Sequence, residues 1–109
     1  MDQIHSALLE LGVPASLQGF AYLHDGIKMV VEDAGILYSI TKRIYPTIAK
    51  RHGKTASQVE RAMRHAVEDG VMRAEPEVMQ RYFGNSIDPE KGKPSNREFI
   101  AALALHLRK

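Results

Sequence analysis

Apolar residues recur every three or four positions along most of this chain, which is the spacing of amphipathic α-helices. The pattern predicts helices over residues 2–11, 17–33, 36–43, 46–52, 55–69, 76–83 and 96–107. The segment 36–43 is expected to form only a turn or two. No pair of segments alternates like β-strands, and neither an internal repeat nor a linker is apparent. The sequence therefore predicts an all-α fold, a compact bundle of about six helices forming a single domain over residues 1–109.

Residues that stop or start helices mark the boundaries. Gly12 and Pro14 separate the first two helices, and Ser16 is placed to cap the second. Pro46 lacks an amide hydrogen, so we expect a fresh helix to begin near it. Residues 69–70, Asp-Gly, are expected to loosen or end the long helix.

The C-terminal part combines a loop and a capped helix. Residues 84–94 are rich in Gly, Pro, Asn and Asp, which predicts an exposed loop or hairpin. Ser95 and Glu98 have the spacing of a capping box, in which each side chain bonds the other residue's main-chain amide. The apolar run that follows predicts a final amphipathic helix.

Composition excludes several classes of protein. With 109 residues, 44% of them hydrophobic, the chain fits one domain with a modest core. It has no run of about 18 apolar residues and no secretory leader, so neither a membrane span nor secretion is expected. The absence of cysteine excludes disulfides, thiolate metal sites and a cysteine nucleophile, and it suits a reducing cytoplasm.

Charge is distributed unevenly along the chain. Residues 41–73 hold eight Lys or Arg against three acidic residues, a net charge of +5. The remaining residues hold seven basic and ten acidic side chains, a net charge of −3. A basic segment on an acidic body is typical of a surface that binds a polyanion, although solvated helix faces have the same pattern.

Within this basic segment, residues 46–69 have the spacing of a helix-turn-helix. The motif needs a small residue where the helices cross, which Ala49 supplies, and a residue that tolerates positive φ in the turn, which Gly53 supplies. Val59 and Ala62 would hold the second helix against the core. Lys54 stands where an apolar residue is common in such motifs.

The second helix of this motif divides into two faces. Its inward side consists of Val59, Ala62, Met63 and Ala66. Its outward side consists of Ser57, Gln58, Arg61, Arg64, His65 and Glu68, with Glu60 at the margin. Arginine can bond guanine, glutamine can bond adenine, and a carboxylate can accept from cytosine, so this face has the side chains that base reading requires. The cations best placed to hold phosphates are Lys50, Arg51, Lys54 and His65.

An ordinary solvated helix would explain part of the same pattern. Glu60–Arg64 and Arg64–Glu68 are pairs one turn apart, which are common on surface helices. Thr55 and Gln58 have the spacing of a capping box, so Gln58 is also suited to a structural role.

The sequence offers little support for a catalytic site or a metal site. His65 and Asp69 are one turn apart, but no third ligand accompanies them, and the other histidines are scattered. No nucleophile–base pair and no glycine-rich phosphate loop is apparent. We therefore predict no metal site, no cofactor and no enzymatic activity.

Three segments resemble a known family. They are SITKRIYPTIAKRHGKTASQVERAMRHAVE at 39–68, LGVPASLQGFAYLHDGIKMV at 11–30, and YFGNSI with KPSNREFIA within 82–101. Together they resemble the DNA-binding effector domain of the master sporulation response regulator of endospore-forming bacteria. The resemblance covers nearly the whole chain, and VERAMRHA is its most specific part.

The resemblance implies a six-helix domain whose recognition helix is residues 55–69. Members of the family bind duplex DNA at a short box, TGTCGAA, often as tandem dimers, and activate or repress transcription in the cytoplasm. By position, the base-reading residues would be Gln58, Glu60 and Arg61, where the family usually has arginine at position 58. Residues near phosphates would be Ser57, Arg64 and His65.

Two further expectations follow from the resemblance. The segment after the recognition helix resembles the family's contact surface for the housekeeping sigma subunit of RNA polymerase, which here includes Ala74, Val78, Gln80 and Phe83. A phosphorylated receiver domain precedes the effector domain in the family, and this sequence contains none. The alternative is an adaptor or protein-interaction module that keeps the fold without binding an operator specifically, which the departures at residues 58 and 69–71 would suit.

Overall fold

The computed structural model describes residues 2–84 and 92–108, and this part of the chain is helical without a strand. Its α-helices are α1 (Gln3–Glu10), α2 (Gln18–Glu32), α3 (Tyr45–His52), α4 (Ala56–Arg73), α5 (Pro76–Phe83) and α6 (Asn96–Leu107). A 3₁₀ turn, η1 (Ala34–Ser39), and a π turn, η2 (Ile40–Ile44), connect α2 to α3. The predicted all-α bundle of about six helices is confirmed.

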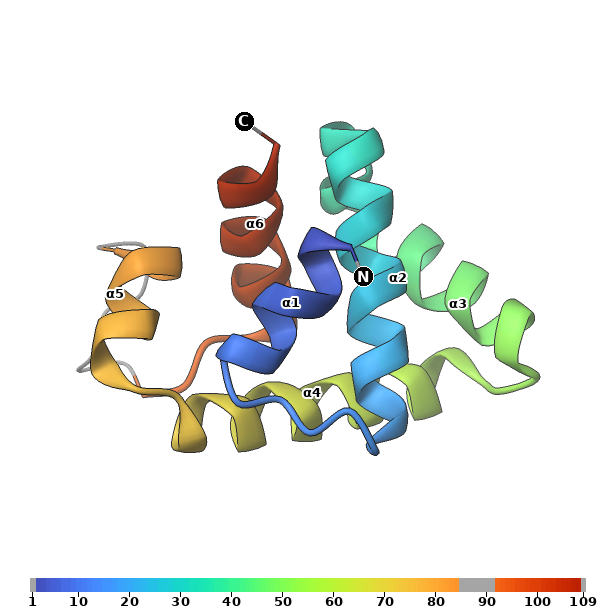
Figure 1. Ribbon diagram of the computed structural model, residues 1–109. Coiled ribbons are helices and arrows are strands. Elements are labelled where there is room, and N and C mark those ends of the chain that lie inside the picture. The colour runs from blue at the N-terminus through green and yellow to red at the C-terminus, as the bar shows by residue number, and fades with distance from the viewer. Residues whose placement is uncertain (1, 85–91, 109) are drawn as a thin grey trace.

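The long helix α4 forms one side of the molecule (Figure 1). In that view it lies along the bottom, and α2 and α6 rise from its upper side with α1 in front of them. The short helix α3 precedes α4 at one end, and α5 follows it at the other. One face of α4 is therefore covered by the bundle, and the opposite face is turned away from every other helix.

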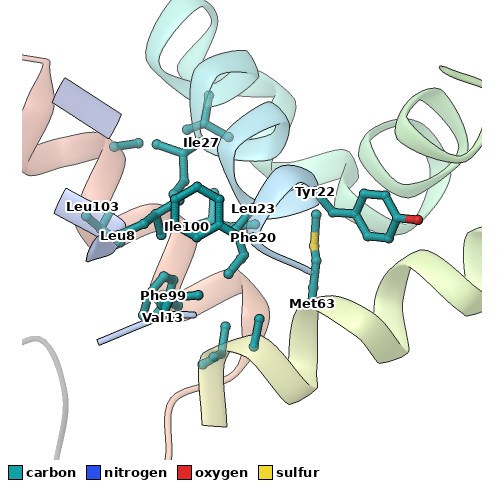
Figure 2. Close-up of a cluster of buried hydrophobic side chains, with 14 of the residues drawn as sticks. Leu8, Val13, Phe20, Tyr22, Leu23, Ile27, Met63, Phe99, Ile100 and Leu103 are labelled. Carbon is teal, nitrogen blue, oxygen red and sulfur yellow. The ribbon is translucent and has the colours of Figure 1, made fainter. Parts of the chain in front are cut away.

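The core lies where α2, α4 and α6 meet. Leu23 and Ile27 from α2 are fully buried with Met63 from α4, and Figure 2 shows them gathered with Phe99 and Ile100 from α6. Burial of each such side chain contributes about 1.5–3 kcal/mol. The hydrophobic stripe of α4 is thus what fixes this helix to the rest of the molecule.

Two glycines allow α4 to lie unusually close to its neighbours. A Cβ on Gly19 of α2 would lie 2.2 Å from the carbonyl oxygen of Ala62. A Cβ on Gly70 of α4 would lie 2.7 Å from Cγ2 of Val13. Both distances are shorter than any real carbon contact, so the backbones approach each other only because these side chains are missing.

The end of α4 differs from the one predicted from the sequence. Asp69-Gly70 was expected to loosen or end the long helix, but α4 continues to Arg73. Glycine destabilises an isolated helix by about 1 kcal/mol relative to alanine. Gly70 is buried, and its packing against the segment between α1 and α2 offsets that cost. The helix therefore ends four residues later than predicted.

Other boundaries differ in smaller ways. The N-cap of α2 is Leu17, without a side-chain bond, so Ser16 does not cap it. The segment 36–43 forms parts of the 3₁₀ and π turns rather than α-helix, and α3 begins at Tyr45 with Pro46 in its first turn. The capping box of Ser95 and Glu98 is present as predicted. Most of the predicted 84–94 loop, residues 85–91, lies outside the described residues.

Candidate nucleic-acid interface

The turn between α3 and α4 has the conformation that the helix-turn-helix prediction required. Gly53 ends α3 with φ 65° and ψ 38°, a left-handed conformation that glycine adopts without steric strain. The main-chain amides of Gly53 and Lys54 both donate to the carbonyl oxygen of Ala49. Ala49 itself is buried, as expected for the residue at the helix crossing. This turn fixes the angle at which α4 leaves α3.

A capping box then starts α4. The main-chain nitrogen of Gln58 donates to Thr55 Oγ1 at 3.1 Å. In return, the main-chain nitrogen of Thr55 donates to the side-chain oxygen Oε1 of Gln58 at 2.9 Å. The side-chain oxygen of Gln58 is therefore already used within the protein. Its side-chain NH₂ group keeps two donors that this interaction does not occupy.

The two faces of α4 agree with the predicted division. Val59, Met63 and Ala66 are fully buried, and Ala62 is half-buried. The exposed residues on the outward side are Ser57, Gln58, Arg61, Arg64 and His65. Glu60 and Glu68 are partly buried at the margins. The outward side faces away from the bundle along the length of α4 (Figure 1).

The cations of this surface differ in what surrounds them. Arg64 Nε lies 3.5 Å from Glu60 Oε2, so the one-turn pair predicted from the sequence forms and partly neutralises both groups. Arg61 makes no ion pair with any of the described residues. Its guanidinium is thus available for a ligand without first breaking a salt bridge within that part of the chain.

The last turn of α3 and the turn that follows it add more positive charge. Lys50, Arg51 and Lys54 are exposed, and none of them has an ion pair within residues 2–84 and 92–108. All three residues lie within six positions of Ala56, the first residue of α4. The structure therefore leaves these three cations exposed and free of ion pairs within the described residues, directly before α4 in the chain.

His52, the last residue of α3, lies at the surface. Its Nε2 is 3.0 Å from Asp25 Oδ2, and its ring packs edge-on against Tyr22 with centroids 5.0 Å apart. The side chain joins α3 to α2 rather than to α4.

Asn96 and Tyr45 are residues that the sequence interpretation did not single out. A cleft of about 380 Å³ separates α4 from the start of α6, and its lining residues are Tyr45, Glu60, Arg64, Glu68 and residues 93–98. Asn96 Nδ2 donates to Tyr45 Oη and to the main-chain oxygen of Glu60, both at 3.1 Å. Burial raises the pKa of Tyr45, which favours the protonated hydroxyl. The signal for Asn96 was its spacing from Phe99, Ile100 and Leu103, which places it on the buried side of α6.

The residues expected to contact the sigma subunit are Ala74, the C-cap of α4, and three residues of α5. Gln80 is exposed, Ala74 and Val78 are half-buried, and Phe83 is buried against Phe99 with ring centroids 5.5 Å apart. Glu10 of α1 holds α5 from the other side. It accepts hydrogen bonds from Tyr82 Oη at 2.5 Å and from Arg81 Nη1 at 2.7 Å.

These bonds shift the titration of the groups that make them. The Tyr82 hydroxyl, and then the Arg81 guanidinium, hold the pKa of Glu10 below its ordinary value of 4.5. Burial, and then the bond to Glu10, raises the pKa of Tyr82 to about 12. These pKa shifts are those expected of a structural interaction that ties α1 to α5. We call Glu10, Arg81 and Tyr82 the α1–α5 clamp.

Two other kinds of site are not found in the described part of the chain. No group of three or more His, Asp or Glu side chains within residues 2–84 and 92–108 is arranged to hold a metal ion. No helix there has the length and apolar character that a membrane crossing requires.

Comparison with known families identifies the chain. The family model described as "Sporulation initiation factor Spo0A C terminal" matches residues 4–107, from the first turn of α1 to the last residue of α6. This is a family of DNA-binding transcription-factor domains and not of enzymes. The chain therefore belongs to the Spo0A C-terminal family and is a DNA-binding effector domain of the sporulation-initiation type.

Proposed function

We propose that this domain recognises a specific sequence in duplex DNA by placing α4 in the major groove. The observation that carries the proposal is Arg61, an exposed and unpaired cation among the described residues, on the outward face of a helix whose other face is packed into the core. A helix with its side chains is about 10–12 Å across, which fits a major groove about 12 Å wide. No other helix has to move to let α4 approach DNA (Figure 1).

The outward side chains differ in the bases that they suit. Arg61 can bond guanine through both of its terminal nitrogens, and Glu60 can accept from the amino group of cytosine. Gln58 can donate through its amide nitrogen, but its oxygen already accepts one bond from Thr55, which restricts how the side chain can turn toward a base. This argues for Glu60 and Arg61 as the principal base-reading residues and for a lesser contribution from Gln58.

The phosphate contacts would come from the turn region of the motif and from α4. Lys50, Arg51 and Lys54 lie at the end of α3 and in the turn, and Ser57, Arg64 and His65 lie along the sides of the outward face of α4. Such contacts position the helix without selecting a sequence. The pairing of Arg64 with Glu60 suits a role in which Arg64 also keeps the Glu60 carboxylate in place.

The finer features of the family are part of the same proposal. The target would resemble the box TGTCGAA, bound by tandem copies, and the single domain would act as an activator or repressor in the cytoplasm. Contact with the sigma subunit would involve Gln80 and the half-buried Ala74 and Val78. Phe83, which is buried, would support that surface from beneath.

The test is a fluorescence anisotropy titration of the protein with two labelled duplexes. One duplex contains the box, and the other has the same base composition in scrambled order. At about 150 mM salt, specific recognition predicts affinity for the box at least about a thousandfold tighter than non-specific binding. Equal affinities for the two duplexes would contradict sequence-specific recognition.

The alternative is an adaptor that keeps the fold but does not bind an operator. The observations that favour it are the use of Gln58 in the helix cap and the neutralisation of Arg64 by Glu60. Both leave fewer free groups for base reading than the amino-acid types suggest. An adaptor would bind the box and the scrambled duplex alike, which the same titration detects.

A further inference from the structure

Asn96 is the one buried polar residue in the described part of the chain, with 6% of its surface exposed. It is the first residue of α6, and the residues before and after it restrict the backbone there. Pro94 before it is buried, and Ser95 and Glu98 form the capping box around it. The side chain of Asn96 is therefore presented to the neighbouring helices from a fixed position.

The amide of Asn96 joins three helices that are far apart in sequence. Its nitrogen donates to Tyr45 on α3, 51 residues away, and to the carbonyl of Glu60 on α4, 36 residues away. A main-chain carbonyl can only accept, so the nitrogen of the amide must face Glu60. The amide oxygen then points elsewhere, and it is buried without a hydrogen-bond partner among the described residues.

An unpartnered buried oxygen lowers stability, so stability alone does not explain an asparagine here. Leucine has a similar shape and would bury no polar atom. What asparagine supplies, and leucine cannot, is a directional bond to one chosen point of the α4 backbone. That point is the carbonyl of Glu60, one of the two residues that the proposed function assigns to base reading.

We propose that Asn96 is a positioning residue for DNA recognition, fixing the rotation of α4 about its own axis and so the place of Glu60 and Arg61 in the groove. The inference rests on the proposed function. Side-chain tips lie about 5–6 Å from the axis of a helix, so a rotation of about 10° moves them by about 1 Å. A shift of that size takes a hydrogen bond out of its favourable range. Contacts between cations and phosphates are more tolerant, because flexible side chains can follow the backbone.

Two variants separate positioning from simple stability. Asn96→Leu removes the bond to Glu60 and leaves the Tyr45 hydroxyl buried without its partner. The double variant Tyr45→Phe/Asn96→Leu removes both polar partners, which restores an apolar contact and is expected to recover most of the lost stability. Tyr22→Phe is the matched control, because Tyr22 is also a buried tyrosine but its hydroxyl bonds Gln18 within α2.

Each variant is examined by thermal unfolding and by titration with the box and scrambled duplexes at a temperature where it is folded. We expect both Asn96 variants to lose about tenfold in discrimination between the duplexes, with affinity for the scrambled duplex unchanged. The double variant should keep this loss although its melting temperature recovers. Tyr22→Phe should discriminate as the unsubstituted protein does.

Two results would overturn the positioning role. One is full discrimination by the double variant, which would make Asn96 merely structural. The other is an equal loss of affinity for both duplexes, which would indicate damage to the whole surface. Failure of the proposed function is seen separately, because the unsubstituted protein would then not discriminate between the duplexes at all.

Discussion

At the scale of single residues, the outward side chains of α4 differ in how free they are. Gln58 is held in a helix cap, Arg64 is paired with Glu60, and Arg61 has no ion pair with the described residues. The same helix face thus contains one residue committed to structure, one shared pair and one free cation. Amino-acid type alone would give all of them equal weight as base readers.

A comparison of Arg61→Ala with Lys54→Ala tests this difference. Arg61→Ala should weaken binding to the box by about 1–3 kcal/mol and relax the preference at one base pair, because it removes a bidentate contact to a base. Lys54→Ala should weaken binding to all duplexes alike, because a phosphate contact carries no sequence information. Anisotropy titrations with boxes altered at one position each provide the measurement. Unchanged discrimination in Arg61→Ala would show that its guanidinium does not contact a base.

The sequence predicted the faces of α4 at this scale, but not the contacts of Asn96. The inward and outward residues follow from spacing along one helix, and the two capping boxes follow from pairs three residues apart. The partners of Asn96 lie 36 and 51 residues away. Such contacts depend on how helices are placed in space, which local spacing does not determine.

At the scale of elements, tertiary packing decided where helices end. α4 continues through Gly70 because Val13 packs directly against the backbone there, in the space that a side chain would occupy. The link between α2 and α3 forms 3₁₀ and π helix, and Gly35 and Pro46 are the residues there that disfavour a continuous α-helix. Periodicity predicted that helices exist in these places, and it could not predict boundaries that neighbours impose.

The clamp between α1 and α5 predicts a pH dependence of stability. The folded state lowers the pKa of Glu10, so this carboxylate contributes stability above pH 4.5 that is lost as the pH falls through its lower folded pKa. Glu10→Gln should therefore be less stable at neutral pH, and the difference from the unsubstituted protein should shrink below pH 4.5. Urea unfolding at a series of pH values measures this. A difference that stays constant from neutral to acidic pH would contradict an ionised clamp.

At the scale of the whole molecule, charge is segregated rather than abundant. The net charge is only +2, but the segment 41–73 holds +5 and the rest of the chain −3. An acidic body disfavours contact between DNA and other faces of the protein, so attraction is directed to the basic segment. The sequence was sufficient to predict this separation of charge, because counting charged residues along the chain requires no knowledge of tertiary contacts.

This segregation predicts a moderate dependence of DNA affinity on salt. If Lys50, Arg51, Lys54, Arg64 and His65 supply about three to five phosphate contacts, the logarithm of affinity should fall with the logarithm of salt concentration with a slope of about −3 to −5 per domain. Lys50→Ala should reduce the magnitude of that slope by about 1. Titrations with the scrambled duplex between about 50 and 200 mM salt provide the slope. A slope near zero would contradict a phosphate-binding role for these cations.

Two glycines at the buried side of α4, Gly19 of α2 and Gly70 of α4 itself, have a consequence for how this protein can change. Gly19 and Gly70 let α4 touch its neighbours at two points along its length, near Ala62 and near Val13. Because two points define a line, these close approaches constrain the tilt of α4, the helix proposed to bind DNA. We therefore expect a larger side chain at either position to shift α4 and change how its outward face is presented, although neither glycine lies on that face.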